Sequence, residues 1–369
     1  MQPKSETATD PAPVVSAMPP WPRNAWYVAA TPAEVAEKPL GRKICGHQMV
    51  FYRTASGAVA AMDDFCPHRG APLSLGFVRG ETLVCGYHGL ALDCLGRADT
   101  MPGQRVKNFP PVRSFPVIER YGFIWVWPGD ADRADPATLP NLHWAESETW
   151  AYGGGLYHIA CDYRLMVDNL MDLTHETYVH ASSIGQREID EAPVRTTVEG
   201  EEVITSRLMD KVTAPPFWQM GLRGAGLPDD GPVDRWQICR FTLPSHVMIE
   251  VGVALEGEGG YDAPADRKAS SIVVDFITPE TETSHWYFWG MARQFAVADE
   301  TLTASIRDGQ AKIFGEDLDM LEQQQANLLR CPDRRLLKLN IDAGGARSRL
   351  LIDRAIAREQ PITDVATAA

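Results

Sequence analysis

Short runs of alternating apolar and polar residues fill the first third of the chain, from about residue 24 to residue 127. AWYVAA, MVFYRTASGAVAAMDD and GFIWVW have the length and the β-branched and aromatic content of strands, and the second contains a turn at residues 55–57. Residues 128–140 combine three prolines with several acidic side chains, which is typical of a linker. The pattern therefore predicts a small all-β domain that ends near this linker.

Longer segments follow the linker. Asp299 is a typical N-cap residue, and it precedes a long helical pattern near the C-terminal end of the chain. The order of the segments predicts an α+β domain in which a long helix packs against a twisted antiparallel sheet. The expected elements are a helix over 162–177, strands over 195–209, 235–254, 270–278 and 284–293, and helices over 299–329 and 346–359.

Composition and charge exclude several classes of function. The chain has 369 residues, enough for two domains, and a net charge of −14. Nucleic acids and anionic membranes bind basic surfaces, so we expect neither as a partner. No apolar run reaches the about 18 residues of a membrane helix, and residues 1–20 lack the features of a secretory signal. The seven scattered cysteines do not indicate a disulfide framework, which favours the cytoplasm.

Two Cys-and-His pairs provide the first candidate metal site. Cys66 with His68, and Cys85 with His88, stand at the two ends of the Gly- and Pro-rich segment CPHRGAPLSLGFVRGETLVCGYHG. Simple burial explains a single Cys or His, and a structural zinc ion also accepts both residue types. Each half, however, contributes one Cys and one His, whereas zinc sites of this kind usually pair the cysteines. The spacing therefore favours a Rieske [2Fe–2S] cluster, in which two Cys bind one iron and two His bind the other.

A second candidate metal site lies in CDYRLMVDNLMDLTHETYVH, residues 161–180. Asn169, Asp172 and His175 are spaced to project from one side of a helix, and His180 follows five residues after His175. A solvated polar face would explain any one of them. Two histidines and a carboxylate together indicate the facial triad of a non-haem Fe(II) site, which leaves positions open for O2.

The carboxylate of this triad has several candidates. Asp172 is one, but the C-terminal helix offers a better one in KIFGEDLDMLEQQQ. Asp317 has apolar residues one turn before and one turn after it, whereas Glu316 and Asp319 have largely polar neighbours there. A carboxylate in an apolar stripe is costly unless it is paired or bound to a metal. We therefore interpret Asp317 as the third ligand, with Glu316 or Asp319 as alternatives.

These motifs resemble those of the Rieske non-haem iron oxygenases, and the resemblance extends from about residue 24 to the last helix. It implies that the motif D-N-x-x-D-x-x-H-x4-H supplies His175 and His180 as iron ligands, and that E-D-x-x-x-L-E-x-Q supplies Asp317. Asp172 would relay electrons, because in this family the inner acid contacts the iron-binding His and a cluster His of a neighbouring subunit, here His88. That contact implies a ring of subunits, usually a homotrimer.

The resemblance also implies a domain organisation. Residues 23–135 would be the Rieske domain and 136–360 a helix-grip (START-like) catalytic domain containing the mononuclear iron. The prolines and the absence of periodicity at the start of the chain predict a disordered tail over 1–22, and 361–369 would be a second tail. In high-potential respiratory Rieske proteins each cluster loop carries a further Cys, and the two form a disulfide. Ala71 and Tyr87 stand at those places here, so the resemblance is to the oxygenase type.

The expected cofactors are one [2Fe–2S] cluster and one Fe(II) per chain, with electrons from NADH. The chain has no G-x-G-x-x-G that opens a helix after a strand and no plant-type ferredoxin motif, so a separate flavin/ferredoxin-type reductase is the expected partner. The resemblance is closest to members that O-demethylate an aromatic methoxy acid with O2, giving a phenol and formaldehyde. O-demethylation or hydroxylation of another methoxybenzoate or aromatic acid is an alternative, and a Rieske electron carrier is an alternative of a different class.

Residues that contact the substrate are harder to identify from the sequence. His246 and Asp275 are polar residues within apolar strand segments, and each is either a substrate ligand or a satisfied core residue. Aromatic side chains on strands are more often core than pocket, although several here have the character of an aromatic wall. These are Trp236, Phe217, Trp218, Trp286 and Phe288.

Overall fold

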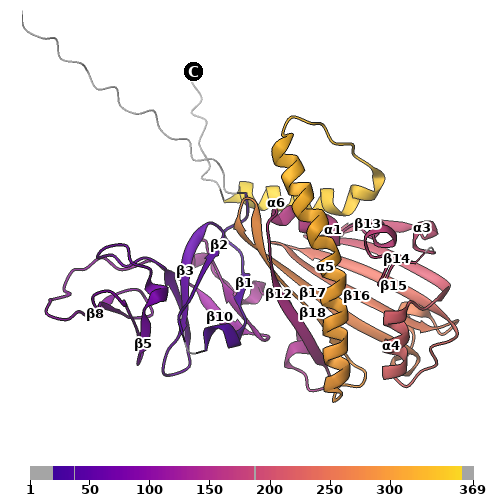
Figure 1. The fold of residues 1–369 in the computed structure, drawn as a ribbon, viewed down its shortest axis with the longest axis horizontal. Helices are drawn as coiled ribbons and strands as arrows, with labels where there is room; N and C mark the ends of the chain where they lie inside the picture. The colour runs from indigo at the N-terminus through magenta and orange to yellow at the C-terminus, as the bar shows by residue number, and fades with distance from the viewer. Residues whose placement is uncertain (1–19, 37, 187, 360–369) are drawn as a thin grey trace, which may run out of the picture.

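The computed structural model describes residues 20–36, 38–186 and 188–359. The tails expected over 1–22 and 361–369 therefore lie almost entirely outside the described residues. The two expected parts are visible in Figure 1 as a group of short strands at one end and a large sheet with its helices at the other. Among the described helices, none has the length and apolarity needed to cross a membrane.

The N-terminal part is all-β, as the sequence predicts. Its strands form three small antiparallel sheets with the orders β1-β11-β10, β2-β3-β4-β9 and β5-β6-β7-β8. The expected turn at residues 55–57 joins β3 to β4, and Gly57 adopts the positive φ that this turn requires. The strands are β1 (Tyr27–Ala30), β2 (Leu40–Ile44), β3 (His47–Arg53), β4 (Val59–Asp63), β5 (Phe77–Arg79), β6 (Thr82–Val84), β7 (Ala91–Leu92), β8 (Ala98–Thr100), β9 (Ser114–Phe115), β10 (Val117–Arg120) and β11 (Phe123–Val126).

The expected linker contains two short 3-10 turns, η3 (Ala131–Arg133) and η4 (Pro136–Thr138). Asp130 and Asp135 cap them by accepting hydrogen bonds from backbone amides two residues later. The boundary between the domains at residue 135 stays a prediction.

The C-terminal part is built on one antiparallel sheet of seven strands in the order β12-β18-β17-β16-β15-β14-β13. The helix α5 (Glu300–Arg330) lies across this sheet and packs on β12 and β18 (Figure 1). Asp299 caps it by accepting a hydrogen bond from the Leu302 amide, as expected of an N-cap. The strands are β12 (Ala151–Ile159), β13 (Val194–Glu199), β14 (Glu202–Thr213), β15 (Pro232–Thr242), β16 (His246–Leu255), β17 (Lys268–Thr281) and β18 (Ser284–Arg293).

Aromatic packing joins the elements on either side of the sheet. Trp125 of β11 packs edge-on against Phe276 of β17, with ring centroids 5.2 Å apart, and belongs to an apolar cluster shared by the N-terminal strands and the large sheet. Trp289 of β18 packs against Phe314 of α5. The remaining helices are α1 (Tyr163–Leu170), α2 (Glu176–Val179), α3 (Glu188–Glu191), α4 (Pro216–Gly224) and α6 (Ala343–Arg358).

Several element boundaries differ from the sequence-based expectation. The strand expected over 195–209 is the hairpin β13–β14, because Gly200 makes a positive-φ turn between them. The segment 235–254 is likewise two strands, since Pro244 has no amide hydrogen to continue the ladder. The helix expected over 162–177 stops at Leu170 and resumes as α2. The sequence pattern did not predict β12 or α4.

The glycine run of β12 has a packing function. A Cβ atom at Gly155 would lie 2.5 Å from Cζ2 of Trp289, the ring that contacts α5. The run therefore lets β12 pass close to β18 under the long helix.

We predict that Gly155→Ala lowers the midpoint of thermal unfolding, because overpacking of this kind costs about 1–3 kcal/mol. Gly315→Ala is the matched control, since nothing lies within 4 Å of its added methyl and alanine favours the helix over glycine. Differential scanning calorimetry of both variants tests the interpretation, which would be wrong if Gly155→Ala unfolded no earlier than the control.

Candidate metal centres

The two Cys-and-His loops have matching backbone structures. In the first, the Cys66 amide donates to the Ala71 carbonyl and the Gly70 amide donates to the Cys66 carbonyl. In the second, the Cys85 amide donates to the Leu90 carbonyl and the Gly89 amide donates to the Cys85 carbonyl. Both glycines have positive φ, at 71° and 74°, which lets each loop fold back tightly. The sequence segment thus makes two equivalent loops, one between β4 and β5 and one between β6 and β7.

The side chains of these loops are arranged as a two-iron cluster requires. The Cys66 and Cys85 thiols are buried, whereas His68 and His88 are exposed with their ring centroids 4.5 Å apart. Burial raises the pKa of the Cys66 thiol, so a bound cation would be needed to hold it as a thiolate. All seven cysteines lie in the described part of the chain and are free, in agreement with the absence of a loop disulfide. The residues therefore fit a cluster with an inner, cysteine-bound iron and an outer, histidine-bound iron.

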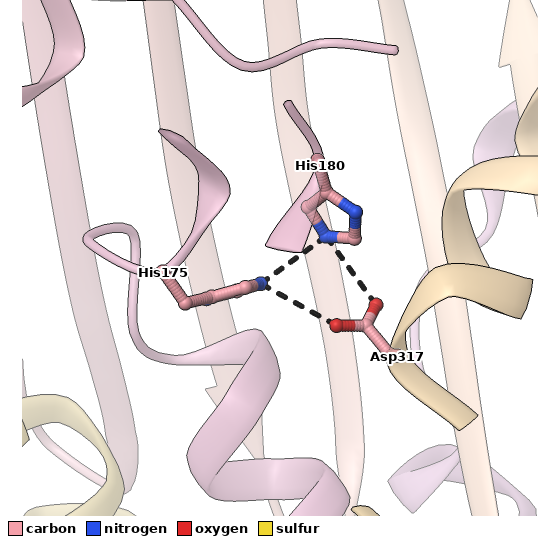
Figure 2. A group of neighbouring side chains, drawn as sticks. All are labelled: His175, His180 and Asp317. Carbon is pink, nitrogen blue, oxygen red and sulfur yellow. Dashed lines mark hydrogen bonds and ion pairs between the residues drawn. The ribbon is translucent and has the colours of Figure 1, made fainter. Parts of the chain in front are cut away.

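His175, His180 and Asp317 meet at one point between α2 and α5 (Figure 2). The two histidine Nε2 atoms are 3.2 Å apart, and the carboxylate oxygens of Asp317 lie 3.7 Å from His175 Nε2 and 3.4 Å from His180 Nε2. Their metal-binding atoms all lie within 4.8 Å of one another. Residues from distant parts of the sequence thus form the donor set of two imidazoles and one carboxylate that suits non-haem iron.

Hydrogen bonds at the opposite ring nitrogens fix the direction of both imidazoles. His175 Nδ1 donates to the Asp172 carbonyl at 2.7 Å, and His180 Nδ1 donates to the Glu316 carboxylate at 2.9 Å. Because each acceptor takes the Nδ1 hydrogen, each Nε2 presents a lone pair toward Asp317. Although burial alone would lower it, the Asp317 and Glu316 carboxylates raise the pKa of His180. The two carboxylates therefore favour a positive charge at Nε2, the position that a metal ion would occupy.

The sequence did not assign Glu316 this role. Its carboxylate also accepts hydrogen bonds from the Ser182 and Ser183 hydroxyls, both at 2.7 Å. Burial opposes the effect, but these donors and His180 hold the pKa of Glu316 below its usual value. The adjacent E-D pair contained one signal. Neighbouring helical residues point in different directions, so Asp317 lies at the Nε2 atoms of both histidines while Glu316 accepts from Nδ1 of His180.

Asn169 and Asp172 support the triad in two further ways. The Asn169 amide donates to Asp317 Oδ1 at 2.9 Å and so fixes the carboxylate. The Asp172 side chain accepts from the Thr174 amide and hydroxyl, both at 2.7 Å, which ends the helix expected to continue here. Its backbone carbonyl then becomes free to accept from His175. The helix break therefore creates the site.

A pocket opens beside the triad, with an empty volume of about 700 Å³ that includes space open to solvent. Its walls are largely apolar and come from α4, the sheet and α5. The polar lining residues apart from the triad are Asn169, Asp172, Glu176, Arg235, Gln237 and Gln310. A largely apolar pocket with a few polar groups beside a metal-binding triad suits a small aromatic ligand.

Comparison with known proteins agrees with both centres. The Rieske [2Fe–2S] domain model matches residues 25–116, and the vanillate O-demethylase oxygenase C-terminal domain model matches residues 159–358. The chain is 70% identical over 346 residues, 94% of its length, to the vanillate O-demethylase oxygenase subunit of Pseudomonas sp. (strain HR199 / DSM 7063), and the match covers 98% of that protein. The chain belongs to the vanillate O-demethylase oxygenase family, within the Rieske non-haem iron monooxygenases.

More distant relatives share the fold. The oxygenase component of dicamba O-demethylase from Stenotrophomonas maltophilia is 38% identical over 304 residues, which cover 81% of this chain and 87% of that protein. A crystal structure of dicamba monooxygenase bound to 3,6-dichlorosalicylic acid superposes with a TM-score of 0.84 at 36% identity, covering 91% of this chain and 98% of that one. The expected order of a Rieske domain and an α+β domain with a C-terminal helix is confirmed by this match.

The structure separates the candidate substrate residues of this oxygenase. Of the aromatic residues, Phe217 and Trp218 of α4 line the pocket. Trp286, Phe288 and Trp236 are not among its lining residues, and Trp236 instead packs against Tyr261. Sequence alone could not distinguish them, because alternate residues of a strand face opposite sides of the sheet.

His246 and Asp275 also lie away from the pocket lining. His246 is buried between Trp125 and Phe276 and contacts the Trp26 carbonyl at 3.2 Å, and burial lowers its pKa to about 4. Asp275 is fully buried and accepts a 2.6 Å hydrogen bond from the Tyr287 hydroxyl. Both therefore lie in the core and away from this pocket. His246 Nδ1 and Asp275 Oδ2 have no hydrogen-bond partner among the described residues, so neither is the fully satisfied core residue of the alternative interpretation.

Asp275 generates a pH prediction. Burial raises the pKa of this carboxyl to about 8, so between the usual value near 4 and about pH 8 the folded chain holds a proton that the unfolded chain releases. Stability must then decrease as pH rises through this range. We expect Asp275→Asn to lose less thermal stability than the parent between pH 5 and 9, as measured by calorimetry. Parallel curves for the two proteins would contradict the assignment.

Proposed function

We propose that this chain is the terminal oxygenase component that O-demethylates vanillate to protocatechuate and formaldehyde, with O2 and electrons from NADH. The triad at the base of a largely apolar pocket is the observation that supports this most directly. The 70% identity to curated vanillate O-demethylase oxygenase subunits supports the choice of substrate. Each turnover would consume one NADH, one O2 and one proton and would release water with the two products.

The residues assigned to the mononuclear iron are His175, His180 and Asp317. These residues fit an iron ion because their metal-binding atoms converge on one point. Hydrogen bonds to Asn169 and Asp172 hold the Asp317 carboxylate and the His175 ring in place. Bound iron would supply O2 activation there, and a cluster on Cys66, His68, Cys85 and His88 would supply electrons one at a time. The protein's own part is to hold the methoxy group at the triad and to keep the pocket walls dry.

The two centres are proposed to work across subunits of a homotrimer. Within one chain the cluster loops belong to the strands around β5, at the end of the molecule away from α1 and α5 (Figure 1). One chain therefore offers no short route between the centres. The exposure of His68 and His88 supports transfer to a neighbour, with Asp172 as the receiving relay at the triad.

Electrons would enter from a separate flavin/ferredoxin-type reductase, as implied by relatives that are named as oxygenase subunits. A Rieske electron carrier, the alternative from a different class, would use the N-terminal part alone. An electron carrier would not explain why His175, His180 and Asp317 come together in the C-terminal part, so we favour the oxygenase. Cytoplasmic localisation is part of the same proposal.

The test combines metal analysis with product analysis. We expect about three irons and two acid-labile sulfides per chain, and one formaldehyde per NADH oxidised when vanillate is supplied with a cognate reductase. Three irons with NADH oxidation but no formaldehyde would contradict the substrate and keep the oxygenase. Two irons and no turnover would contradict the oxygenase itself.

We predict that Asp317→Ala lowers iron to about two per chain, leaves the sulfide content and the cluster spectrum unchanged, and reduces formaldehyde release by more than about 100-fold, the upper range for loss of a mere supporting residue. Asp319→Ala is the matched control, because Asp319 is exposed on the same helix. Equal iron content in the two variants would show that Asp317 is not a ligand.

A further inference from the structure

A group of charged residues is buried beside the triad: Glu176 and Arg235 line the same pocket, and Arg207 contacts Glu176. Arg207, Arg235 and Glu176 are 1%, 2% and 4% exposed. Glu176 Oε1 lies 3.1 Å from Arg207 Nη2, and Glu176 Oε2 lies 3.6 Å from Arg235 Nη2. One carboxylate therefore stands between two guanidinium groups.

Arg207 is fully occupied by its protein partners. Its Nη1 donates to the Leu173 carbonyl, and its Nε and Nη2 both donate to Gln237 Oε1. Gln237 in turn donates to Glu176 Oε1 at 2.7 Å. Glu176 is thus bound mainly to Arg207 and Gln237, and this part of the group is balanced in charge.

Arg235 has one edge without a hydrogen-bond partner. Its Nη1 donates to Gln186 Oε1 at 2.6 Å and approaches the Ile184 carbonyl at 3.5 Å. On the other edge, Nε is buried with no acceptor among the described residues. Nη2 lies 3.6 Å from Glu176 Oε2, beyond hydrogen-bond distance, and that oxygen is likewise buried without a hydrogen-bond partner. Nε and Nη2 together form the two-donor fork that matches a carboxylate.

The charge of Arg235 is only partly compensated inside the protein, because its ion-pair partner Glu176 is shared with Arg207. Arg207, Arg235 and Glu176 sum to one positive charge, and the nearest further carboxylate acting on Arg235, Glu188, is exposed and screened by solvent. Burial lowers the pKa of Arg235 only to about 10, so the group stays a cation at neutral pH. A buried cation with an unpaired edge is costly, and an anionic ligand would remove that cost.

We propose that Arg235 binds the carboxylate of the substrate through its Nε–Nη2 edge and so selects anionic methoxybenzoates over neutral methoxyphenols. Arg235 lines the same pocket as the triad, together with apolar residues of the sheet and α5. If Arg235 binds the carboxylate, the methoxy group at the other end of the substrate can lie at the triad. The inference rests on the proposed function, because it assumes an aromatic acid as substrate.

A purely structural role is the competing explanation. Arg235 contacts the segment around Gln186, and it could serve only to hold that segment against β15. The two roles predict different results for ligands that share a ring and differ in charge. Loss of a structural role would weaken both ligands alike, whereas loss of a carboxylate partner would weaken only the acid.

The experiment measures dissociation constants by isothermal titration calorimetry on the metal-loaded protein. The ligands are 4-hydroxy-3-methoxybenzoate and 4-hydroxy-3-methoxybenzyl alcohol, and the variants are Arg235→Gln, Arg235→Lys and Arg240→Gln. Arg240 is the matched control, since it lies on the same strand, pairs with Glu202 and Glu250, and is absent from the pocket lining. Arg235→Lys keeps the charge and removes the fork.

We expect the parent to bind the acid about 10- to 100-fold more tightly than the alcohol, the range for a charge-assisted pair of hydrogen bonds. Arg235→Gln should abolish this preference and change the alcohol constant by less than about threefold. Arg235→Lys should keep part of the preference, and Arg240→Gln should keep all of it. In turnover, KM for the acid should rise more than kcat falls.

The proposal is overturned if the parent protein binds the acid and the alcohol with equal dissociation constants. It is also overturned if Arg235→Gln raises both dissociation constants by the same factor. Formaldehyde release separates this outcome from failure of the proposed function. A parent that demethylates vanillate but shows no charge preference would keep the function and remove the role of Arg235. A parent that prefers the acid but releases no formaldehyde would keep the carboxylate site and remove the reaction.

Discussion

The catalytic part of this fold depends on two hydrogen bonds that lie on the outer side of the triad. Because His175 and His180 each donate from Nδ1 to an oxygen, both Nε2 atoms present lone pairs toward a carboxylate within 4 Å. Three electron-rich donors pointing at one another repel unless a cation lies between them. The geometry is therefore that of a binding site held ready, and its stability must come from the surrounding structure.

That support comes from elements that the chain brings together over long separations. The Asp172 side chain stops α1, which exposes the carbonyl that orients His175, and α5 supplies both the Asp317 carboxylate and the Glu316 acceptor for His180. The glycine run of β12 allows the close sheet packing over which α5 lies. The metal-binding residues, which lie on two helices, are therefore held in position by the sheet on which these helices pack.

Sequence reasoning predicted the parts that local chemistry determines and missed those that three-dimensional packing determines. The metal-binding residue types, their spacing and the apolar stripe around Asp317 are local, and the structure brings His175, His180 and Asp317 together. The helix break at Asp172 was missed because a side chain bonding its own backbone competes with a periodic apolar pattern that continues through it. Which face of a strand reaches the pocket depends on the register and on what covers the other face, so Trp236 and His246 could not be placed from sequence.

The two buried arginines reverse the usual alternation of buried apolar and exposed polar residues along a strand. In β14, Arg207 is almost fully buried while its neighbour Leu208 is 59% exposed, the reverse of the usual alternation between the core and the solvent. In β15, Arg235 and Gln237 likewise share the inner face, on either side of Trp236, which packs on the other face of the sheet. Folding alone would be better served by apolar residues at these inner positions, because buried ion pairs rarely stabilise a protein relative to a well-packed core. Arg207 is balanced by its protein partners, so the positive charge left over on Arg235 is the part of this inner face that supports an anionic ligand.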